Sequence, residues 1–198
     1  MIQKNDLSEV IKEALRDRHP RVIENQHSLF RHAAVLIPLL DNGNDWSVLL
    51  TQRTQKVEAH KGQISFPGGR IDESDRSLLE TALREAREEV GLHERDVAVL
   101  GRVDDMRTVA SNYIVHPFVG VIPSPYPFTV NKDEVARLIT VPFRVFLDGG
   151  SVMPVRYEGG VYESLAYTYD GEVIWGATAR IMDNLVSIVK EKLQVGAP

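Results

Sequence analysis

Three closely spaced glutamates are the residues of this chain that are most clearly suited to chemistry. Glu85, Glu88 and Glu89 lie at i, i+3 and i+4, a spacing that places three carboxylates on one face of an α-helix. Like charges at this spacing repel by roughly 0.2–0.5 kcal/mol per pair. A divalent cation would compensate the repulsion, because Mg²⁺ and Mn²⁺ prefer carboxylate oxygens and leave coordination positions for substrate phosphate oxygens. The segment therefore indicates a site for Mg²⁺ or Mn²⁺.

The residues on either side of the glutamates argue against a plain solvated surface helix. Charge runs usually line solvated faces, and the neighbouring arginines could make ordinary helix pairs. However, the run Phe66-Pro67-Gly68-Gly69 predicts a turn whose second glycine can offer its carbonyl to the same metal. Gly91 follows the acids directly and is the residue type that ends many helices. We therefore predict a helix over residues 78–90 that follows a glycine turn and carries an acidic stripe.

The hydrophobic pattern predicts the elements that must position this stripe. Apolar residues at helical spacing predict helices, and β-branched runs between turn residues predict strands. The turn-forming sequence DNGND predicts a hairpin between the first two strands, and Pro38 favours an edge or a bulge in the first of them. Because the elements interleave without a strict repeat, we expect an α/β fold with a mixed β-sheet between helices. The expected helices are 6–16, 78–90 and 176–193, and the expected strands are 33–40, 46–51, 97–103, 113–122 and 162–169.

Length and composition limit the class of protein. The 198 residues, 43% apolar and 26% charged, fit one globular domain. The longest apolar run, residues 33–40, is too short to span a membrane, and the first ten residues lack an apolar signal core. The net charge of −5 argues against nucleic-acid binding, and the absence of cysteine excludes thiolate chemistry. We therefore expect a cytoplasmic protein that binds neither nucleic acid nor a membrane.

Residues 69–92 resemble the Nudix box, usually written G-x5-E-x7-R-E-U-x-E-E-x-G-U. Its first half differs here, because fifteen positions rather than fourteen separate Gly69 from Arg84, and Asp75 stands where the first glutamate would be. The resemblance implies metal-dependent hydrolysis of a diphosphate linkage on a Nudix-type α/β/α sandwich. The residues of the second half that fall in register are Arg84, Glu85, Glu88, Glu89, Gly91 and Leu92.

A second motif precedes the box. Residues 49–53, LLTQR, and residues 60–69, HKGQISFPGG, are similar to the motif found before the box in the coenzyme A diphosphatase branch of the Nudix family. The one-residue-longer loop within the box is also familiar in that branch. One basic position differs, because the branch usually has arginine where this chain has Glu58. If that arginine holds a substrate phosphate, the exchange would weaken or alter coenzyme A recognition.

Two later segments extend the resemblance. Residues 131–143 are similar to an acidic segment of the same branch, and residues 174–181 are similar to its C-terminal helix signature. Together the similar segments cover most of residues 31–190. We therefore expect a single Nudix hydrolase domain over residues 1–198, with residues 1–30 as an N-terminal helical extension and residues 31–190 as the core.

The resemblance implies a reaction and leaves two alternatives open. Coenzyme A or an acyl-coenzyme A would be split into 3′,5′-ADP and 4′-phosphopantetheine or its acyl form. The first alternative is a Nudix hydrolase of ADP-ribose, dinucleotides or oxidised nucleotides. The second is a non-catalytic Nudix domain that binds nucleotides. The partner in each case is a small nucleotide, and a homodimer is left open.

The resemblance also assigns expected roles to individual residues. Arg84 is expected to hold a carboxylate by a charge-assisted fork, and the general base is either Glu85 or Glu134. The expected ligands of Mg²⁺ or Mn²⁺ are Gly69, Glu85, Glu88 and Glu89. Substrate contacts, some of which could equally be surface charges or structural groups, are expected from Arg53, His60, Lys61, Gln63, Ser65 and Phe66.

Overall fold

The computed structural model describes residues 7–16, 18–25, 29–43, 45–56, 62–109, 111–157 and 160–195. The helices are α1 (Leu7–Arg16), α2 (Leu78–Val90), the 3-10 helix η2 (Glu94–Asp96), α3 (Phe143–Leu147) and α4 (Gly176–Val195). The strands are β1 (Arg31–Asp41), β2 (Trp46–Arg53), β3 (Ile64–Ser65), β4 (Gly68–Arg70), β5 (Ala98–Arg102), β6 (Met106–Arg107), β7 (Tyr113–Ile122), β8 (Val135–Pro142), β9 (Ser151–Tyr157), β10 (Gly160–Tyr169) and β11 (Glu172–Trp175).

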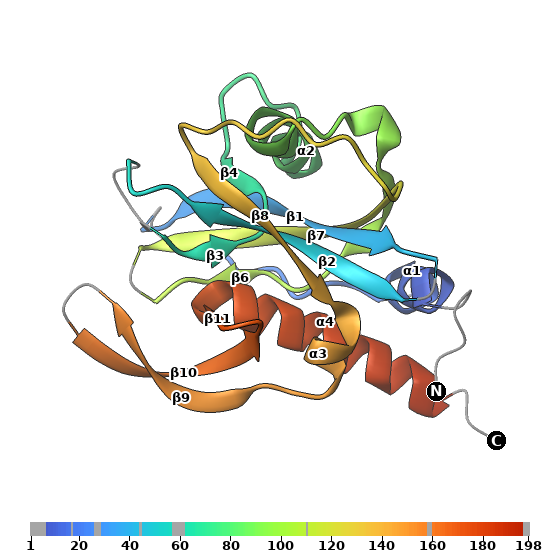
Figure 1. The fold of residues 1–198 in the computed structure, drawn as a ribbon. Helices are drawn as coiled ribbons and strands as arrows, with labels where there is room; N and C mark the ends of the chain where they lie inside the picture. The colour runs from blue at the N-terminus through green and yellow to red at the C-terminus, as the bar shows by residue number, and fades with distance from the viewer. Residues whose placement is uncertain are drawn as a thin grey trace.

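An eight-stranded mixed sheet forms the centre of the molecule. Its strand order is β3-β2-β1-β7-β5, with β4 beside β1, β6 beside β7 and β8 beside β2. Helix α2 covers one face, while α1 and α4 lie on the other (Figure 1). The expected mixed sheet between helices is thereby confirmed. None of the helices that the structure describes combines the length and apolar character needed to cross a membrane.

The position of β1 between two hydrophobic cores explains why residues 33–40 are all apolar. Ala34 and Leu36 belong to the core cluster beneath α2, whereas Ile37 and Leu39 belong to the cluster shared with α1 and α4. Side chains alternate between the two faces of a strand, so a strand with a core on each side needs apolar residues at nearly every position. The expected N-terminal extension contributes to the second core, since Ile11 of α1 is fully buried there.

The prediction that Pro38 places part of β1 at an edge or a bulge is wrong, because β1 is a central strand. It pairs in parallel with β7 from Arg31 to Leu40. Its other side pairs with β4 up to Val35 and with β2 only from Leu39 onward. Backbone groups alternate between the two sides of a strand, and Leu36 donates to Pro67 on the side of β4. Pro38 therefore faces the gap between the two partners, where its missing N–H leaves no ladder bond unmade.

Several elements were not expected from the sequence. Strands β9, β10 and β11 form a separate three-stranded antiparallel sheet, of which only β10 was predicted. Strand β8 pairs with β2 from Ser47 to Arg53, and α3 follows it directly. Thr178, near the start of α4, donates to the carbonyl of Ile64 at 3.1 Å and so ties the last helix to β3. Strand β8 and the contact of Thr178 depend on partners distant in sequence, which a local pattern does not reveal, whereas β9 and β11 pair with β10, their neighbour in sequence.

Candidate active site

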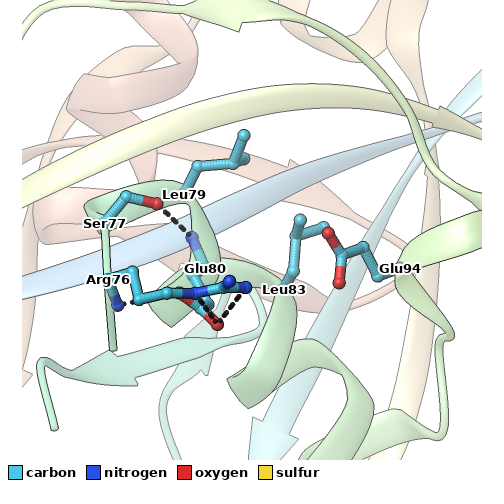
Figure 2. Close-up of a pocket in the computed structure, with 6 residues that line it drawn as sticks. All are labelled: Arg76, Ser77, Leu79, Glu80, Leu83 and Glu94. Carbon is cyan, nitrogen blue, oxygen red and sulfur yellow. Dashed lines mark hydrogen bonds and ion pairs between the residues drawn. The ribbon is translucent and has the colours of Figure 1, made fainter. Parts of the chain in front are cut away.

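Helix α2 begins and ends at the residues that the sequence predicts. Ser77 caps its N-terminus, where the hydroxyl accepts the backbone N–H of Glu80 at 3.1 Å (Figure 2). Gly91 ends the helix in the left-handed conformation, with φ 71°, and its N–H donates to the carbonyls of Ala86 and Arg87. The pocket of about 320 Å³ in Figure 2 opens beside this N-terminus, and Leu79, Glu80 and Leu83 line it. By helical periodicity that side of α2 faces away from the three glutamates.

The three glutamates share one side of α2 but differ in depth. The Glu88 side chain is 47% exposed, that of Glu85 is 17% exposed, and that of Glu89 is only 3% exposed. The glycine turn lies directly against them. A Cβ at Gly69 would stand 2.5 Å from the carboxyl carbon of Glu85, so only glycine permits this approach. The backbone N–H of Gly68 points to the Glu89 carboxylate, with a nitrogen-to-oxygen distance of 3.4 Å.

Burial makes the acidic cluster electrostatically unfavourable. It is the main cause that raises the pKa of Glu89 to about 8, with contributions from the nearby charges of Glu85 and Glu134, while Arg53 opposes the shift. Burial also raises the pKa of Glu85, again with a contribution from Glu134. The cluster therefore holds more negative charge than its protein neighbours compensate. Such a site favours protons or a bound cation.

Arg84 organises the outer part of the cluster. Its Nε and Nη2 donate to the two carboxylate oxygens of Asp75 at 2.9 and 3.0 Å. Its Nη1 donates to Glu85 at 2.9 Å and to Glu88 at 3.1 Å, and Nη2 also donates to the carbonyl of Arg70. One guanidinium thus orients two of the candidate metal ligands while a third carboxylate fixes its own position.

Asp75 is the carboxylate that Arg84 holds by its fork. The Asp75 side chain is 2% exposed, and the fork from Arg84 holds its pKa well below the usual range. The Thr81 hydroxyl and the backbone N–H of Asp72 donate to the same carboxylate at 2.8 and 2.9 Å. The sequence left the role of Asp75 open and predicted only that Arg84 holds a carboxylate.

The part of the β7–β8 connection that follows Pro127 brings Glu134 to the cluster. The N–H groups of Thr129 and Asn131 donate to the carbonyls of Val90 and Glu89, at 3.0 and 2.9 Å. These bonds satisfy carbonyls at the end of α2 that have no partner within the helix. The Asn131 side chain then donates to Glu134 Oε1 at 3.1 Å. The connection thus places a fourth carboxylate close enough to affect the pKa values of Glu85 and Glu89.

The expected substrate residues fall into different environments. Arg53 lies at the end of β2, with Nη1 3.7 Å from Glu89 Oε1, and its buried Nε has no hydrogen-bond partner among the described residues. Its backbone N–H donates to the carbonyl of Gln63, and Ser65 pairs with β2. Phe66 is 3% exposed within the core, so its side chain packs instead of presenting the expected substrate contact. The predictions for His60 and Lys61, like the exchange at Glu58, lie outside the described residues.

The side chains of the cluster fit a hard divalent cation by their chemistry. All the candidate ligands offer oxygen, and burial leaves Glu85 and Glu89 with poorly compensated negative charge. As they stand, no three acidic or histidine side chains in the described ranges are grouped closely enough to hold a metal ion. Arg84 separates Glu85 from Glu88, and Glu89 points toward Gly68. The ligand types are therefore present in an arrangement that differs from a closed coordination shell.

Comparison with known proteins identifies the family. The model of the NUDIX domain matches residues 30–147. A Yersinia pestis (strain Pestoides F) protein named "Uncharacterized Nudix hydrolase NudL" is 38% identical over 161 residues, which make up 80% of each chain. The chain belongs to the Nudix family. It is a Nudix hydrolase, an enzyme that acts on pyrophosphate bonds, and Nudix hydrolases generally use divalent metal ions.

Solved structures share the Nudix fold seen here. A Caenorhabditis elegans Ap4A hydrolase superimposes with a TM-score of 0.54 and 12% identity, covering 83% of this chain and 98% of that one. A MutT/nudix family protein from Enterococcus faecalis superimposes with a TM-score of 0.52 and 14% identity, covering 98% of this chain and 75% of that one. At these identities the likeness concerns the fold alone. It supports the mixed α/β architecture and leaves the substrate open.

Proposed function

We propose that this Nudix hydrolase splits the diphosphate of coenzyme A or an acyl-coenzyme A into 3′,5′-ADP and 4′-phosphopantetheine or its acyl form. The observation that carries the proposal is the meeting of the two parts of the motif that precedes the box. The N–H of Arg53 bonds to the carbonyl of Gln63, and the Arg53 guanidinium faces Glu89 of the box. A motif typical of the coenzyme A branch therefore borders the acidic cluster directly.

In this proposal Glu85, Glu88 and Glu89, with the carbonyl of Gly69, would hold Mg²⁺ or Mn²⁺. The cation would lower the pKa of water and neutralise charge on the phosphoryl oxygens. Arg84 keeps Glu85 and Glu88 oriented, as its hydrogen bonds to both already do. The protein's remaining task is to position the diphosphate and to remove a proton from the attacking water.

Either Glu85 or Glu134 serves as the base that removes this proton. Burial raises the pKa of Glu85 toward the range in which a carboxylate accepts a proton efficiently. Glu134 is held by the Asn131 amide at 3.1 Å and lies outside the helix that carries the metal ligands. Exchange of each residue for glutamine distinguishes the two, because loss of the base removes the acidic limb of the pH–rate profile while loss of a metal ligand weakens the response to added metal.

A substrate panel with product identification tests the proposal. Coenzyme A, acetyl-coenzyme A, ADP-ribose, NADH and a dinucleoside polyphosphate are each incubated with the enzyme in Mg²⁺ and in Mn²⁺. We expect the highest kcat/KM for a coenzyme A compound, with 3′,5′-ADP and a phosphopantetheine as the products found by mass spectrometry. Preferred cleavage of ADP-ribose or a dinucleotide, with coenzyme A intact, would establish the first alternative. Binding without cleavage of any compound would establish the non-catalytic domain.

The matched control for the panel is Glu88→Gln. Glu88 is half exposed, so its exchange for an isosteric amide has little effect on packing. We expect turnover to fall by orders of magnitude while thermal unfolding stays cooperative. Unchanged turnover in this variant would remove Glu88 from the site and leave the panel's substrate ranking unaffected.

The first alternative has one observation in its favour. Glu58 places an acid within the motif where the coenzyme A branch usually has arginine, and an acid would repel a phosphate group. The ADP-ribose and dinucleotide arms of the panel address this alternative directly.

The proposal also covers the setting of the reaction. We place the enzyme in the cytoplasm as one Nudix domain over residues 1–198, acting on a small nucleotide substrate and not on nucleic acid, in keeping with its net charge of −5. Light scattering coupled to size exclusion decides whether the protein is a homodimer.

A further inference from the structure

A continuous chain of hydrogen bonds joins the N-terminal segment to the sheet. It includes none of the residues of the acidic cluster. Asn25 Nδ2 lies 3.0 Å from His32 Nε2, and His32 Nδ1 lies 2.9 Å from His116 Nε2. His116 Nδ1 lies 2.8 Å from Asp105 Oδ1. Asp105 and His116 are buried, and the two imidazole planes differ by only 6°. We refer to Asn25, His32, His116 and Asp105 as the histidine chain.

The hydrogen positions in the histidine chain follow from one fixed amide. Asn25 Oδ1 accepts the N–H of Phe30 at 3.1 Å, and Asn25 Nδ2 donates to the carbonyl of Phe30 at 2.7 Å. This pair of bonds sets the orientation of the amide, so Nδ2 must also be the donor to His32 Nε2. His32 therefore carries its hydrogen on Nδ1 and donates to His116. His116 in turn carries its hydrogen on Nδ1 and donates to Asp105.

The histidine chain has no place for an additional proton. A hydrogen added to His32 Nε2 would face the Asn25 amide donor. A hydrogen added to His116 Nε2 would face the hydrogen on His32 Nδ1. Either case sets two donors against each other, and reversal of the Asn25 amide would break both of its bonds to Phe30. Proton uptake is therefore coupled to the loss of at least one link.

The groups around His32 include some that lower its pKa and one that raises it. Burial lowers the pKa of His32, the neighbouring His116 lowers it further, and Asp105 opposes them. The Arg102 guanidinium pairs with Asp105 and lies 3.4 Å from His116 Nδ1. Other charged groups on the packed elements are the Asp104–Arg18 ion pair and Arg70, which lies over the ring of Tyr113.

The same residues hold the N-terminal segment in place. The N–H of Ile23 donates to Asp105 Oδ2 at 3.0 Å, and the N–H of Arg21 donates to Asp104 Oδ1 at 2.8 Å. Asp105 returns a bond from its own N–H to the carbonyl of Arg21. On the other side, the carbonyl of His32 accepts the N–H of Ile71, next to the glycine turn of the active site. Residues 18–25 and the start of the Nudix box thus border one polar chain.

We propose that the histidine chain is an acid-sensitive latch, which holds residues 18–25 against the sheet and releases them when it takes up one proton. The direction follows from linkage. A histidine whose pKa is lower in the folded state than in the unfolded state contributes stability above its unfolded pKa. That contribution is lost as the pH falls below about 6.5, the ordinary value for histidine. The latch is therefore closed at neutral pH and opens in mild acid.

Nitrogen NMR of the full-length protein tests the hydrogen positions. At about pH 8 we expect the ring nitrogens of His32 and His116 both to report a hydrogen on Nδ1. A hydrogen on Nε2 of His32 would overturn the proposal, since the chain would then run in another direction. The measurement needs neither metal nor substrate, so its outcome is independent of the proposed diphosphatase activity.

Hydrogen exchange tests the release itself. After correction for the intrinsic effect of pH, we expect the amide protection of Arg21 and Ile23 to fall roughly tenfold or more between about pH 8 and about pH 5.5. The variant His93→Gln is the matched control, because His93 is an exposed histidine outside the chain. It should retain the full acid sensitivity. Equal protection of both amides at the two pH values in the wild type would overturn the proposal.

A variant that reverses the pH dependence of amide protection distinguishes a latch from a merely structural cluster. In Asn25→Asp a carboxylate faces His32 Nε2, so the chain gains an acceptor and can hold the added proton. Protection of Arg21 and Ile23 should then be greater in acid than at neutral pH, and in His116→Gln the acid sensitivity should largely disappear. If both variants instead keep the acid sensitivity of the wild type, the proposal is wrong, whatever their overall stability.

Discussion

Asp75, in the loop before α2, and Glu89, in the last turn of α2, are two carboxylates with little solvent exposure, and their pKa values shift in opposite directions. Their side chains are 2% and 3% exposed. The Arg84 fork holds the pKa of Asp75 well below its usual range, whereas burial raises the pKa of Glu89 to about 8. Asp75 receives two guanidinium donors, a hydroxyl and an N–H at 3.0 Å or less. Glu89 has a distant N–H at 3.4 Å and Arg53 at 3.7 Å.

The difference shows that donor geometry and depth of burial together set the pKa of a carboxylate that is shielded from solvent. A carboxylate with several short donors stays ionised in the interior, and one with distant donors takes up a proton. Asp75 is therefore suited to a structural role, in which it positions Arg84. Glu89 is suited to exchange its proton for a metal ion. The following predictions test this division, beginning with the largest effect.

Exchange of Glu89 for glutamine should separate activity from stability. We expect kcat/KM to fall on the order of 100–1000-fold, as for the loss of a group that stabilises transition-state charge. Without metal at about pH 7, the unfolding free energy should change by less than about 1 kcal/mol, because an amide resembles the protonated carboxyl already present. Steady-state kinetics and urea unfolding in EDTA measure the two quantities. A stability loss as large as that of Asp75→Asn would contradict the division of roles.

Asp75→Asn should produce the complementary result. The exchange removes the fork but leaves Arg84 its bonds to Glu85 and Glu88, so it should lower the unfolding free energy by about 1–3 kcal/mol. Urea unfolding in EDTA measures the loss, and Glu73→Gln, at an exposed acid on the same loop, is the control. Activity at saturating metal should fall less than in Glu89→Gln, because Asp75 acts only through Arg84. A neutral effect on stability would show that the fork contributes little.

The pH dependence of the metal-free protein should report the raised pKa of Glu89. A carboxyl whose folded pKa lies near 8, above its unfolded value, contributes stability that is present at low pH and lost as the pH rises through the folded pKa. Between about pH 6 and pH 8 we expect this group to remove about 2 kcal/mol. Unfolding curves in EDTA measure the slope, and the difference from Glu89→Gln isolates it from histidine titration. Saturating Mg²⁺ should abolish the loss, because the cation takes the place of the proton.

The smallest effect concerns Glu58, which lies outside the described residues. If Glu58 occupies the place of a phosphate-binding arginine, Glu58→Arg should lower the KM for coenzyme A several-fold and leave kcat nearly unchanged. Glu163→Arg, which makes the same charge change on exposed β10, controls for net charge. An equal shift in both variants would indicate a general electrostatic effect, and no shift in either would make the exchange at Glu58 incidental.

Sequence patterns predicted the elements whose signals are local. Helix α2 has the predicted bounds because Ser77 and Gly91 cap it from within a few residues, and β7 also has its predicted bounds. Strand β8 was missed because it pairs with β2, a strand distant in sequence. Strands β9 and β11 were missed although they pair with β10, their neighbour in sequence. Pro38 was misread because its tolerance in a central strand depends on where β1 changes partners.

The candidate active site was predicted from the sequence in part. The spacing of Glu85, Glu88 and Glu89 places them on one side of α2, and the structure also brings Gly69 and Glu134 to that side. Phe66 was expected at the substrate and lies in the core. The histidine chain left no signal in the sequence, since His32 and His116 are 84 positions apart and become neighbours only through the parallel pairing of β1 and β7.

The sequence by itself therefore determined the family, the acidic helix and the class of chemistry, because capping, helical periodicity and motif spacing act over a few residues. The tertiary structure alone decided which buried acid stays charged, which arginine holds which carboxylate, and how two distant histidines share their hydrogens. These properties depend on burial and on donors supplied by other strands and loops, and neither exists until the chain has folded.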